Sequence, residues 1–499
     1  MNTSEKLSAF YARLEELYRL RCVTGLLNWD QQVFMPPQAS DFRAAQLESM
    51  GRLIHQRETE NQFVDLVQGL FDQLETLNDD DKVNVLETHR AVERARKLPE
   101  SFVAEQSKVC ALSYSAWCVA RPANDFKSVA PHLTKIVELA RQEADLVGYA
   151  EHPYDALLDQ YEPYARLSQI KPVLTRLGEK LSRLYPRIQE KIGVVAELHG
   201  EFAEEQQRRL CERIARDVGY DFERGRLDKT HHPFESSLGP RDVRITTRYS
   251  SSNYLSTVFT TLHETGHALY ELGLPERHKG TPLGSAVSLG VHESQSRLWE
   301  NIVGRSPQFS RYLHGLLGEI FPDEQKRTNA EQIWQQCNKV APSLIRVEAD
   351  EVTYSLHVVV RLVLEEQLIS GALSVSELPG AWDQMYQRYL GISSPHHKDG
   401  VLQDVHWYGG MLGYFPTYAL GNIYAGCIYE KALSDLPGLE HGFERGEFRP
   451  LLEWLRVQVH QHGMRHKPLT LVERICGHAV NEAPFLKYLA DKFGCEQHD

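Results

Sequence analysis

The chain has 499 residues, enough for a large buried core, and its net charge of −13 argues against a nucleic-acid partner, which requires a basic surface. Eight cysteines without a C-x-x-C pair are too few and too scattered for a disulfide scaffold. The N-terminus lacks an apolar signal segment and no apolar run approaches the ~20 residues of a membrane span, so we expect a cytoplasmic protein with no membrane partner.

The first half of the sequence predicts one helix after another. Apolar residues recur at three- and four-residue spacing from Ser4, which is placed as an N-cap. Charged residues fill the other faces, and prolines separate the segments. We interpret these apolar stripes as helix faces packed in the core. Further stripes of this kind cover residues 61–76, 80–97, 130–148 and 166–194.

The pattern changes near the middle of the chain. Residues 241–249 alternate apolar or β-branched side chains with polar ones, and this period of two predicts a half-buried strand. The Ser and Asn residues at 250–253 end the strand and offer caps for the next helix. Helical spacing resumes at Leu255. We therefore expect a small antiparallel β element directly before a helix, within a mainly α protein.

That helix carries the motif His263-Glu264-Thr265-Gly266-His267. The two histidines stand at i and i+4, so they project from one face and can bind one metal ion through ring nitrogens at about 2.0–2.1 Å. Glu264 points about 100° around the helix from the first histidine. It can act as a base on a water molecule without binding the metal. The motif predicts the active site of a metallopeptidase.

A catalytic zinc site requires three protein ligands and one open position. Glu293 is predicted as the third ligand, on a second helix over 289–300 that follows His267 after a loop. His292 and Glu300 are the competing ligands on the same helix. Other groups should orient the ligand imidazoles, and Asp350, Glu351 and Asp404 are the alternatives for this role.

With these residues in place, the chain resembles the carboxypeptidase Taq family of metallocarboxypeptidases. The resemblance covers nearly the whole chain and depends on short motifs in the family's order. These motifs are Trp29-Asp30-Gln31 with Met35-Pro36, His232-Pro233-Phe234, the D-x-R-x-T of 242–246, H-E-x-x-H at 263–267, H-E-S-Q at 292–295, Ile345 to Asp350, and the G-x-x-Q-D-x-H-W of 400–407.

The resemblance implies an almost wholly helical fold with two lobes around a deep active-site cleft, and a homodimer. We expect a single peptidase domain over 1–499, with an N-terminal helical lobe to about residue 200 and the metal-site and substrate-binding region after it. The implied activity is removal of single residues from peptide C-termini, with broad side-chain tolerance and poor action at proline. One divalent metal per subunit is implied, zinc first, with cobalt or manganese as alternatives.

The family motifs also indicate candidate catalytic residues in addition to Glu264. The oxyanion of peptide hydrolysis needs at least one donor in addition to the metal. His232, His406 and Tyr408 are the candidates, and the sequence does not rank them. Each could equally be a structural hydrogen-bonding group.

A carboxypeptidase must recognise a free α-carboxylate, which suits the planar fork of an arginine. Arg346 and Arg244 both lie in family motifs, and we favour Arg346 as the carboxylate ligand. Either arginine could instead pair with a neighbouring acid, such as Asp242 beside Arg244. The strand that holds Arg244 could also pair with the extended substrate backbone.

Two other functions remain open on the sequence alone. An oligopeptidase could cut internal bonds with the same metal centre, and it would not need an arginine for the terminal carboxylate. A catalytically silent peptide-binding protein could retain the helical shell. The presence of Glu264 beside the predicted ligands speaks against a silent protein, which would have no use for a base.

Overall fold

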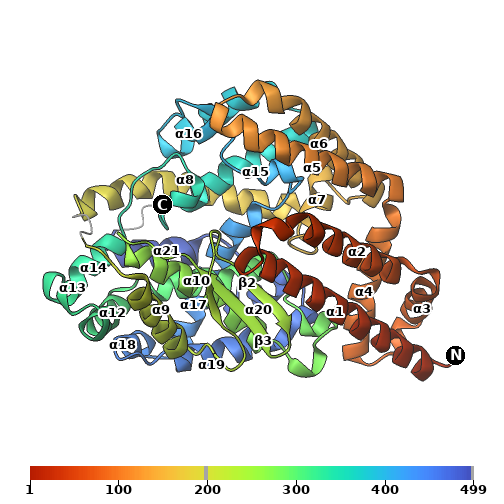
Figure 1. Ribbon diagram of the computed structural model, residues 1–499, viewed down its shortest axis with the longest axis horizontal. Coiled ribbons are helices and arrows are strands. Elements are labelled where there is room, and N and C mark those ends of the chain that lie inside the picture. Colours follow the sequence, from red (N-terminus) through yellow and green to blue (C-terminus); the bar gives the residue numbers. More distant parts are fainter. Residues whose placement is uncertain (196–199, 496–499) are drawn as a thin grey trace.

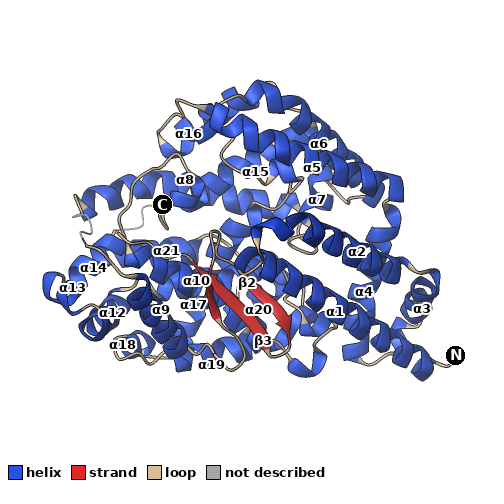
Figure 2. Ribbon diagram, in the orientation of Figure 1, coloured by secondary structure: helices blue, strands red, loops and turns tan. Residues whose placement is uncertain are grey.

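A computed structural model describes residues 1–195 and 200–495 of the chain. Helices form most of it, and Figure 2 shows strands at one place only, so the mainly α expectation is confirmed. No helix in this described part is both long and apolar enough to cross a membrane. The helices before the strands are α1 (Thr3–Val33), α2 (Ser40–Thr59), α3 (Asn61–Phe71), α4 (Asp79–Lys97), α5 (Glu100–Ala123), α6 (Phe126–Val147), α7 (Pro153–Leu158), α8 (Leu167–Ile192) and α9 (Glu204–Val218).

The first helix illustrates how local sequence sets the element boundaries. Asn2, not Ser4, caps α1, because its side chain accepts the backbone N–H of Glu5 while the Glu5 carboxylate accepts the N–H of Asn2. The apolar stripe of α1 packs on α3 and α4, where Phe10 is fully buried. The four further stripes predicted in this half correspond to α3, α4, α6 and α8.

The strands form one small sheet in the order β1 (Leu227–Lys229), β3 (Asp242–Thr247), β2 (Glu235–Gly239). The predicted strand is β3, and it pairs with β2 in the expected antiparallel way. Its other neighbour, β1, runs parallel, so the sheet is mixed. Because β3 lies in the centre, its backbone is paired on both sides, and the strand of Arg244 cannot pair with a substrate.

The second half of the chain contains the helices that build the candidate site. Asn253 caps the first of them by accepting the backbone N–H of Ser256. A π-helical segment, Leu298–Val303, continues directly from α11. These helices are α10 (Tyr254–Gly273), α11 (Leu289–Arg297), α12 (Pro307–Ile320), α13 (Pro322–Arg327), α14 (Ala330–Cys337), α15 (Tyr354–Ser370), α16 (Leu378–Leu390), α17 (Pro416–Asp435), α18 (Leu439–Phe443), α19 (Arg449–Gln458), α20 (Pro468–Cys476) and α21 (Ala483–Phe493).

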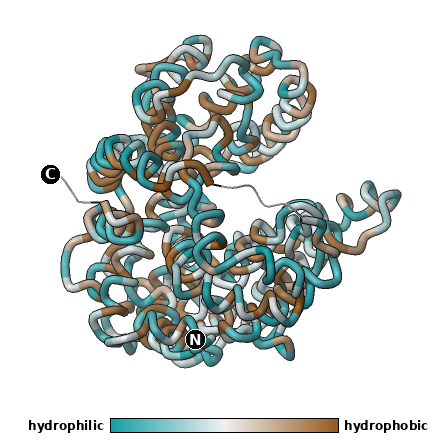
Figure 3. The backbone as a smooth tube through the Cα atoms, turned by 90° about the vertical axis from the view of Figure 1, so that its left-hand side faces the viewer, coloured by the Kyte–Doolittle hydropathy of each residue, from teal (hydrophilic) through white to brown (hydrophobic). Residues whose placement is uncertain are grey.

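Two groups of helices can be distinguished in space. In Figure 1, α5, α6 and α16 lie above a larger body that contains the sheet and α10, and Figure 3 shows the same division from the side. One hydrophobic core nevertheless extends from Ala120 to Phe493 and includes residues of both groups. A second, smaller core lies among the first helices around Phe10. The single domain and its division near residue 200 both stay predictions.

Glycines allow α10, α11 and α17 to approach closely. A Cβ added to Gly266 would lie 2.6 Å from the Cα of Ser296, and one added to Gly421 would lie 2.5 Å from the Cγ of Glu293. Neither neighbour is the free end of a flexible side chain, so a larger residue would force the helices apart. The second x-position of the motif, Gly266, is therefore constrained by the packing against α11.

Replacing Gly266 by alanine tests this constraint. We expect Gly266→Ala to lower the free energy of unfolding by about 1–3 kcal/mol, because the added methyl group overpacks the α10–α11 contact. Gly51→Ala on α2 is the control, since no atom lies within 4 Å of its added Cβ. Removing a helical glycine there should stabilise the protein by about 0.5–1 kcal/mol. Urea unfolding of both variants measures the difference, and equal midpoints would contradict the packing argument.

Candidate metal centre

The histidines of the motif project from the side of α10 that faces α11. Their neighbours Leu262 and Leu269 are fully buried in the core, which fixes the rotation of the helix about its axis. His263 and His267 keep part of their surface accessible. On α11, Ser288 caps the helix by accepting the N–H of Val291, and this places the side chain of the following glutamate toward α10.

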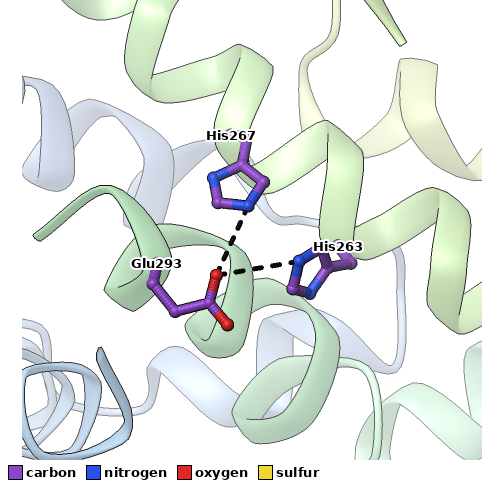
Figure 4. A group of neighbouring side chains, drawn as sticks. All are labelled: His263, His267 and Glu293. Atoms are coloured by element: carbon purple, nitrogen blue, oxygen red, sulfur yellow. Dashed lines mark ion pairs between the residues drawn. The ribbon is translucent and has the colours of Figure 1, made fainter. Parts of the chain in front are cut away.

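His263, His267 and Glu293 converge on one point (Figure 4). The Oε2 atom of Glu293 lies 3.8 Å from His263 Nε2 and 3.5 Å from His267 Nε2. The three ligand atoms all lie within 4.8 Å of one another. Two imidazole nitrogens and one carboxylate oxygen form the donor set typical of a catalytic zinc site, so these residues fit a divalent cation.

The other ring nitrogen of each histidine is held by a different partner. His263 Nδ1 lies 2.8 Å from Glu300 Oε2, and His267 Nδ1 lies 2.5 Å from His292 Nδ1. The two competing ligands of the sequence prediction are therefore outside the converging set. Each contacts the back of one histidine, which leaves both Nε2 atoms directed at Glu293.

The three carboxylates expected to orient the imidazoles contact other groups instead. Asp350 accepts the backbone N–H groups of Val352 and Thr353 at the start of α15, and Glu351 pairs with Lys492 at 2.6 Å. Asp404 pairs with two arginines described below. That expectation was wrong, and Glu300 takes the role for His263. Its position in the π-helical segment directs it toward α10, and sequence periodicity does not reveal such a segment.

Glu293 is held as an anion by an arginine on its own helix. Arg297 Nε donates to Glu293 Oε1 at 2.6 Å, so the second oxygen, Oε2, is the one that faces the histidines. Burial alone would raise the pKa of Glu293, but Arg297, His263 and His267 outweigh it and lower this pKa well below its ordinary value. The carboxylate is therefore ready to bind a cation at neutral pH.

Glu264 lies outside the converging set, as the prediction for a base requires. Its side chain is only 7% exposed. Burial raises its pKa to about 7, with the charges of Glu293 and Glu300 adding to this and His263 opposing it. A backbone N–H of Glu235 on β2 also donates to the carboxylate. A carboxyl group that titrates near neutral pH can both accept and return a proton.

Arg346 is 4% exposed and belongs to a buried network of charges. Its Nε and Nη2 donate to Asp404 Oδ1 at 3.0 and 2.8 Å, and its Nη1 donates to the Tyr354 hydroxyl at 2.9 Å. Arg361 Nε donates to the second oxygen of Asp404 at 2.7 Å. Two guanidinium groups share one carboxylate, so this trio carries an excess positive charge. The arginine does pair with an acid, but the acid is not one of its sequence neighbours.

Arg244 is engaged elsewhere. Both oxygens of Asp242 accept from its guanidinium at 2.8 Å, and the same group lies 4.2 Å above the ring of Trp29 on α1. These contacts use two of the five N–H groups of the guanidinium and attach the sheet to the first helix. The role of Arg244 as a substrate ligand stays a prediction.

The three candidate oxyanion donors occupy different environments. Tyr408 is fully buried, stacks on Trp117 and donates to the carbonyl of Val401, so it cannot reach a substrate and that prediction was wrong. His232 is exposed on the connection between β1 and β2, and its role stays a prediction. His406 is half-buried, and its Nδ1 lies 3.9 Å from Oδ1 of Asp404, the carboxylate of the Arg346 network.

His406 is held in its neutral form. Burial lowers its pKa to about 4, and the nearby charges of Arg346 and Arg361 add to this effect, while Asp404 opposes it. Its ring centroid lies 5.5 Å from that of Tyr414 and 6.4 Å from that of Tyr418. A neutral imidazole here can donate a hydrogen bond without bringing a further positive charge.

The structure also reveals site residues that no sequence motif indicated. Tyr414 and Tyr418 lie near Glu293: burial raises the pKa of both hydroxyls, and the charge of Glu293 contributes in each case. Arg346 lies 5.2 Å from the centroid of the Tyr418 ring. Arg297, the partner of Glu293, lies 4.4 Å above Tyr354. Their only sequence signal is their proximity to the motifs, which does not distinguish them from core residues.

Comparison with known proteins gives consistent matches over nearly the whole chain. Residues 9–493 match the family described as carboxypeptidase Taq (M32) metallopeptidase. The chain is 44% identical to thermostable carboxypeptidase 1 of Thermus thermophilus, covering 97% of this chain and 98% of that protein. It is 36% identical to carboxypeptidase 1 of Bacillus subtilis, covering 99% and 98%. The crystal structure of an M32 carboxypeptidase from Deinococcus radiodurans is similar with a TM-score of 0.95 at 40% identity, covering 98% of this chain and 99% of that one.

Glu300→Gln tests whether the carboxylate behind His263 supports metal binding. We expect zinc affinity to fall about 10- to 100-fold, because the imidazole loses its charged hydrogen-bond partner. Competition with a chelator at fixed pH measures the affinity. Glu319→Gln on the exposed face of α12 is the control and should bind zinc as the wild type does. Wild-type affinity in Glu300→Gln would exclude this role.

Proposed function

The chain belongs to the carboxypeptidase Taq (M32) family of metallopeptidases and is a metal-dependent carboxypeptidase; we propose that it releases single residues from the C-termini of peptides. We further propose broad side-chain tolerance and poor action at proline. The observation that carries the proposal is the combination of the His263, His267 and Glu293 cluster with the excess positive charge around Arg346.

We propose that His263, His267 and Glu293 hold one divalent metal per subunit, with zinc as the first candidate and cobalt or manganese as alternatives. The donor set of two imidazoles and one carboxylate supports this assignment. When bound, such a metal lowers the pKa of a coordinated water and polarises the scissile carbonyl. A homodimer and a cytoplasmic location are further proposals, which rest on the family resemblance and on the sequence.

Glu264 is proposed as the general base. Its pKa near 7 allows it to be ionised at the start of the reaction and to take a proton from water. The proton can then pass from the same carboxyl group to the leaving amine. The burial that raises this pKa also keeps the side chain in one place, which general acid–base catalysis requires.

Arg346 is proposed to bind the terminal α-carboxylate of the substrate. Three of its N–H groups are used by Asp404 and Tyr354, which fixes the orientation of the guanidinium while leaving its other two N–H groups for a ligand. Arg361 supplies the second positive charge, and Asp404 neutralises only one of the two. A carboxylate bound here would bring that trio of side chains to charge balance.

His406 is proposed to donate to the oxyanion of the tetrahedral intermediate. It is neutral, partly accessible and in contact with the tyrosine cluster beside Glu293. His232 remains an alternative, since it precedes β2, the strand whose N–H reaches Glu264. A fixed donor of this kind stabilises developing negative charge without reorganisation.

Glu264→Gln tests whether Glu264 acts as the base without binding the metal. The amide retains the shape of the side chain but cannot accept a proton, so we expect kcat to fall by about 10²- to 10⁴-fold. Zinc content should stay at the wild-type level, because Glu264 is not one of the converging residues. Undiminished turnover in a zinc-loaded variant would refute the proposed mechanism.

The role of Arg346 is tested with matched peptides that end in a free carboxylate or an amide. We expect the wild type to cleave the free acid preferentially and Arg346→Gln to lose about 10- to 100-fold in kcat/KM on it, from the ~1.5–3 kcal/mol of a hydrogen bond to a charged group. Arg244→Gln is the control, and its preference for the free acid should stay unchanged. Equal cleavage of both peptides by the wild type would instead favour an oligopeptidase that cuts internal bonds.

A further inference from the structure

The two histidines of the metal centre are supported in chemically different ways. His263 has a carboxylate, Glu300, behind its Nδ1 atom. His267 has a second histidine, His292, at 2.5 Å from its Nδ1 atom. An imidazole can donate or accept at each nitrogen, so the contact between two rings leaves the position of the proton to be determined. The surroundings of His292 determine it.

The positions of the hydrogens on His267 and His292 follow from what lies on either side of this pair, the metal site and Glu271. If His267 binds the metal through Nε2, as proposed above, its Nδ1 must carry the hydrogen and donate to His292. Nδ1 of His292 is then a bare acceptor, and its remaining hydrogen must lie on Nε2. That nitrogen faces Glu271 Oε1 at 3.4 Å. The contacts therefore run in one direction, from ligand to histidine to carboxylate.

Glu271 is held in place as the final acceptor. Lys279 Nζ donates to its second carboxylate oxygen at 3.3 Å and to its backbone carbonyl at 3.1 Å. Burial opposes ionisation of Glu271, but His292 and Lys279 lower its pKa to about 2. Lys279 is itself buried, in the loop between α10 and α11. The carboxylate thus has a fixed position and a permanent charge at neutral pH.

Packing also restricts the ring of His292. It lies between His267, at 4.5 Å between ring centroids, and Tyr270, at 5.4 Å. Glu162, a buried carboxylate, accepts the backbone N–H of Gly290 at 3.1 Å and so fixes the first turn of α11. The ring therefore has little freedom to turn away from His267.

We propose that His292 and Glu271 are positioning residues that hold His267 in the tautomer that binds metal through Nε2, by a His267–His292–Glu271 relay. This inference rests on the proposed metal centre and extends it to residues that bind no metal. In this arrangement the two histidine ligands differ in basicity, because only His263 donates to an acceptor that is itself charged. A neutral acceptor fixes the ring but raises its basicity less than a carboxylate does.

Two substitutions of His292 separate the relay from simple packing. In His292→Gln, the amide can accept from His267 through its oxygen and donate to Glu271 through its nitrogen, so the direction of the relay is kept. In His292→Phe, the ring still packs on Tyr270 but offers no acceptor. We expect zinc affinity, measured by chelator competition, to fall about 10- to 100-fold in the Phe variant and to stay within about 3-fold of wild type in the Gln variant.

Two further readouts do not depend on how well the Phe variant folds. Nitrogen-15 NMR of the zinc-loaded wild type should show His292 protonated at Nε2 and His267 protonated at Nδ1. The visible spectrum of the cobalt-loaded protein should change in Glu271→Leu, which removes the last acceptor, and stay as in wild type in Glu271→Gln. A His292 proton on Nδ1, or wild-type affinity in a folded His292→Phe, would overturn the relay.

His267→Ala distinguishes failure of the relay from failure of the proposed metal centre. If that variant binds zinc as the wild type does, His267 is no ligand and the proposed centre itself is wrong. If it loses zinc while His292→Phe retains it, the centre stands and only the relay is wrong.

Discussion

The site depends on the close packing of α10 against α11. Gly266 brings the backbone of α10 against that of Ser296, and Gly421 allows α17 to press on the side chain of Glu293. Only at this separation can a carboxylate on α11 reach the two imidazoles on α10. The same contact brings His292 and Glu300 behind the histidines. The helices α10 and α11, with the π-helical segment that continues α11, therefore supply the candidate ligands and the groups that contact them from behind.

The site also depends on the pairing of its buried charges. Glu293 is paired with Arg297, Glu300 with Arg305, and Asp404 with two arginines, all in positions largely removed from water. Buried ions are tolerated only when they are paired and hydrogen-bonded, so each group is held in a fixed orientation. In the Arg346 trio, two guanidinium groups share one carboxylate. In the converging cluster, two imidazoles face the free oxygen of Glu293. These are the places proposed for the metal and the substrate carboxylate.

The sequence predicted the structure well where the functional residues and the helix or strand that carries them lie in one short segment. The spacing of His263, Glu264 and His267 fixed their relative directions on a helix, and the strand over 241–249 was found as β3. It was least informative about side-chain partners. Tyr408 lies two residues after His406 but faces the core, and Arg346 pairs with Asp404 rather than with an acid near it in the sequence. Neighbouring residues can point to opposite sides of a turn, and spacing alone does not say which side faces the site.

The sequence by itself predicted the helical class, the two histidines with Glu264 beside the first of them, and Glu293 as their third partner. These depend on helix geometry and on motifs in a fixed order, both of which are local or linear properties of the chain. Only the tertiary structure decided which groups support the ligands and which acid holds Arg346. Asp404, 58 residues away in the chain, lies 2.8 Å from that arginine. Contacts of this kind depend on how helices pack, and packing is a property of the whole chain rather than of any one segment.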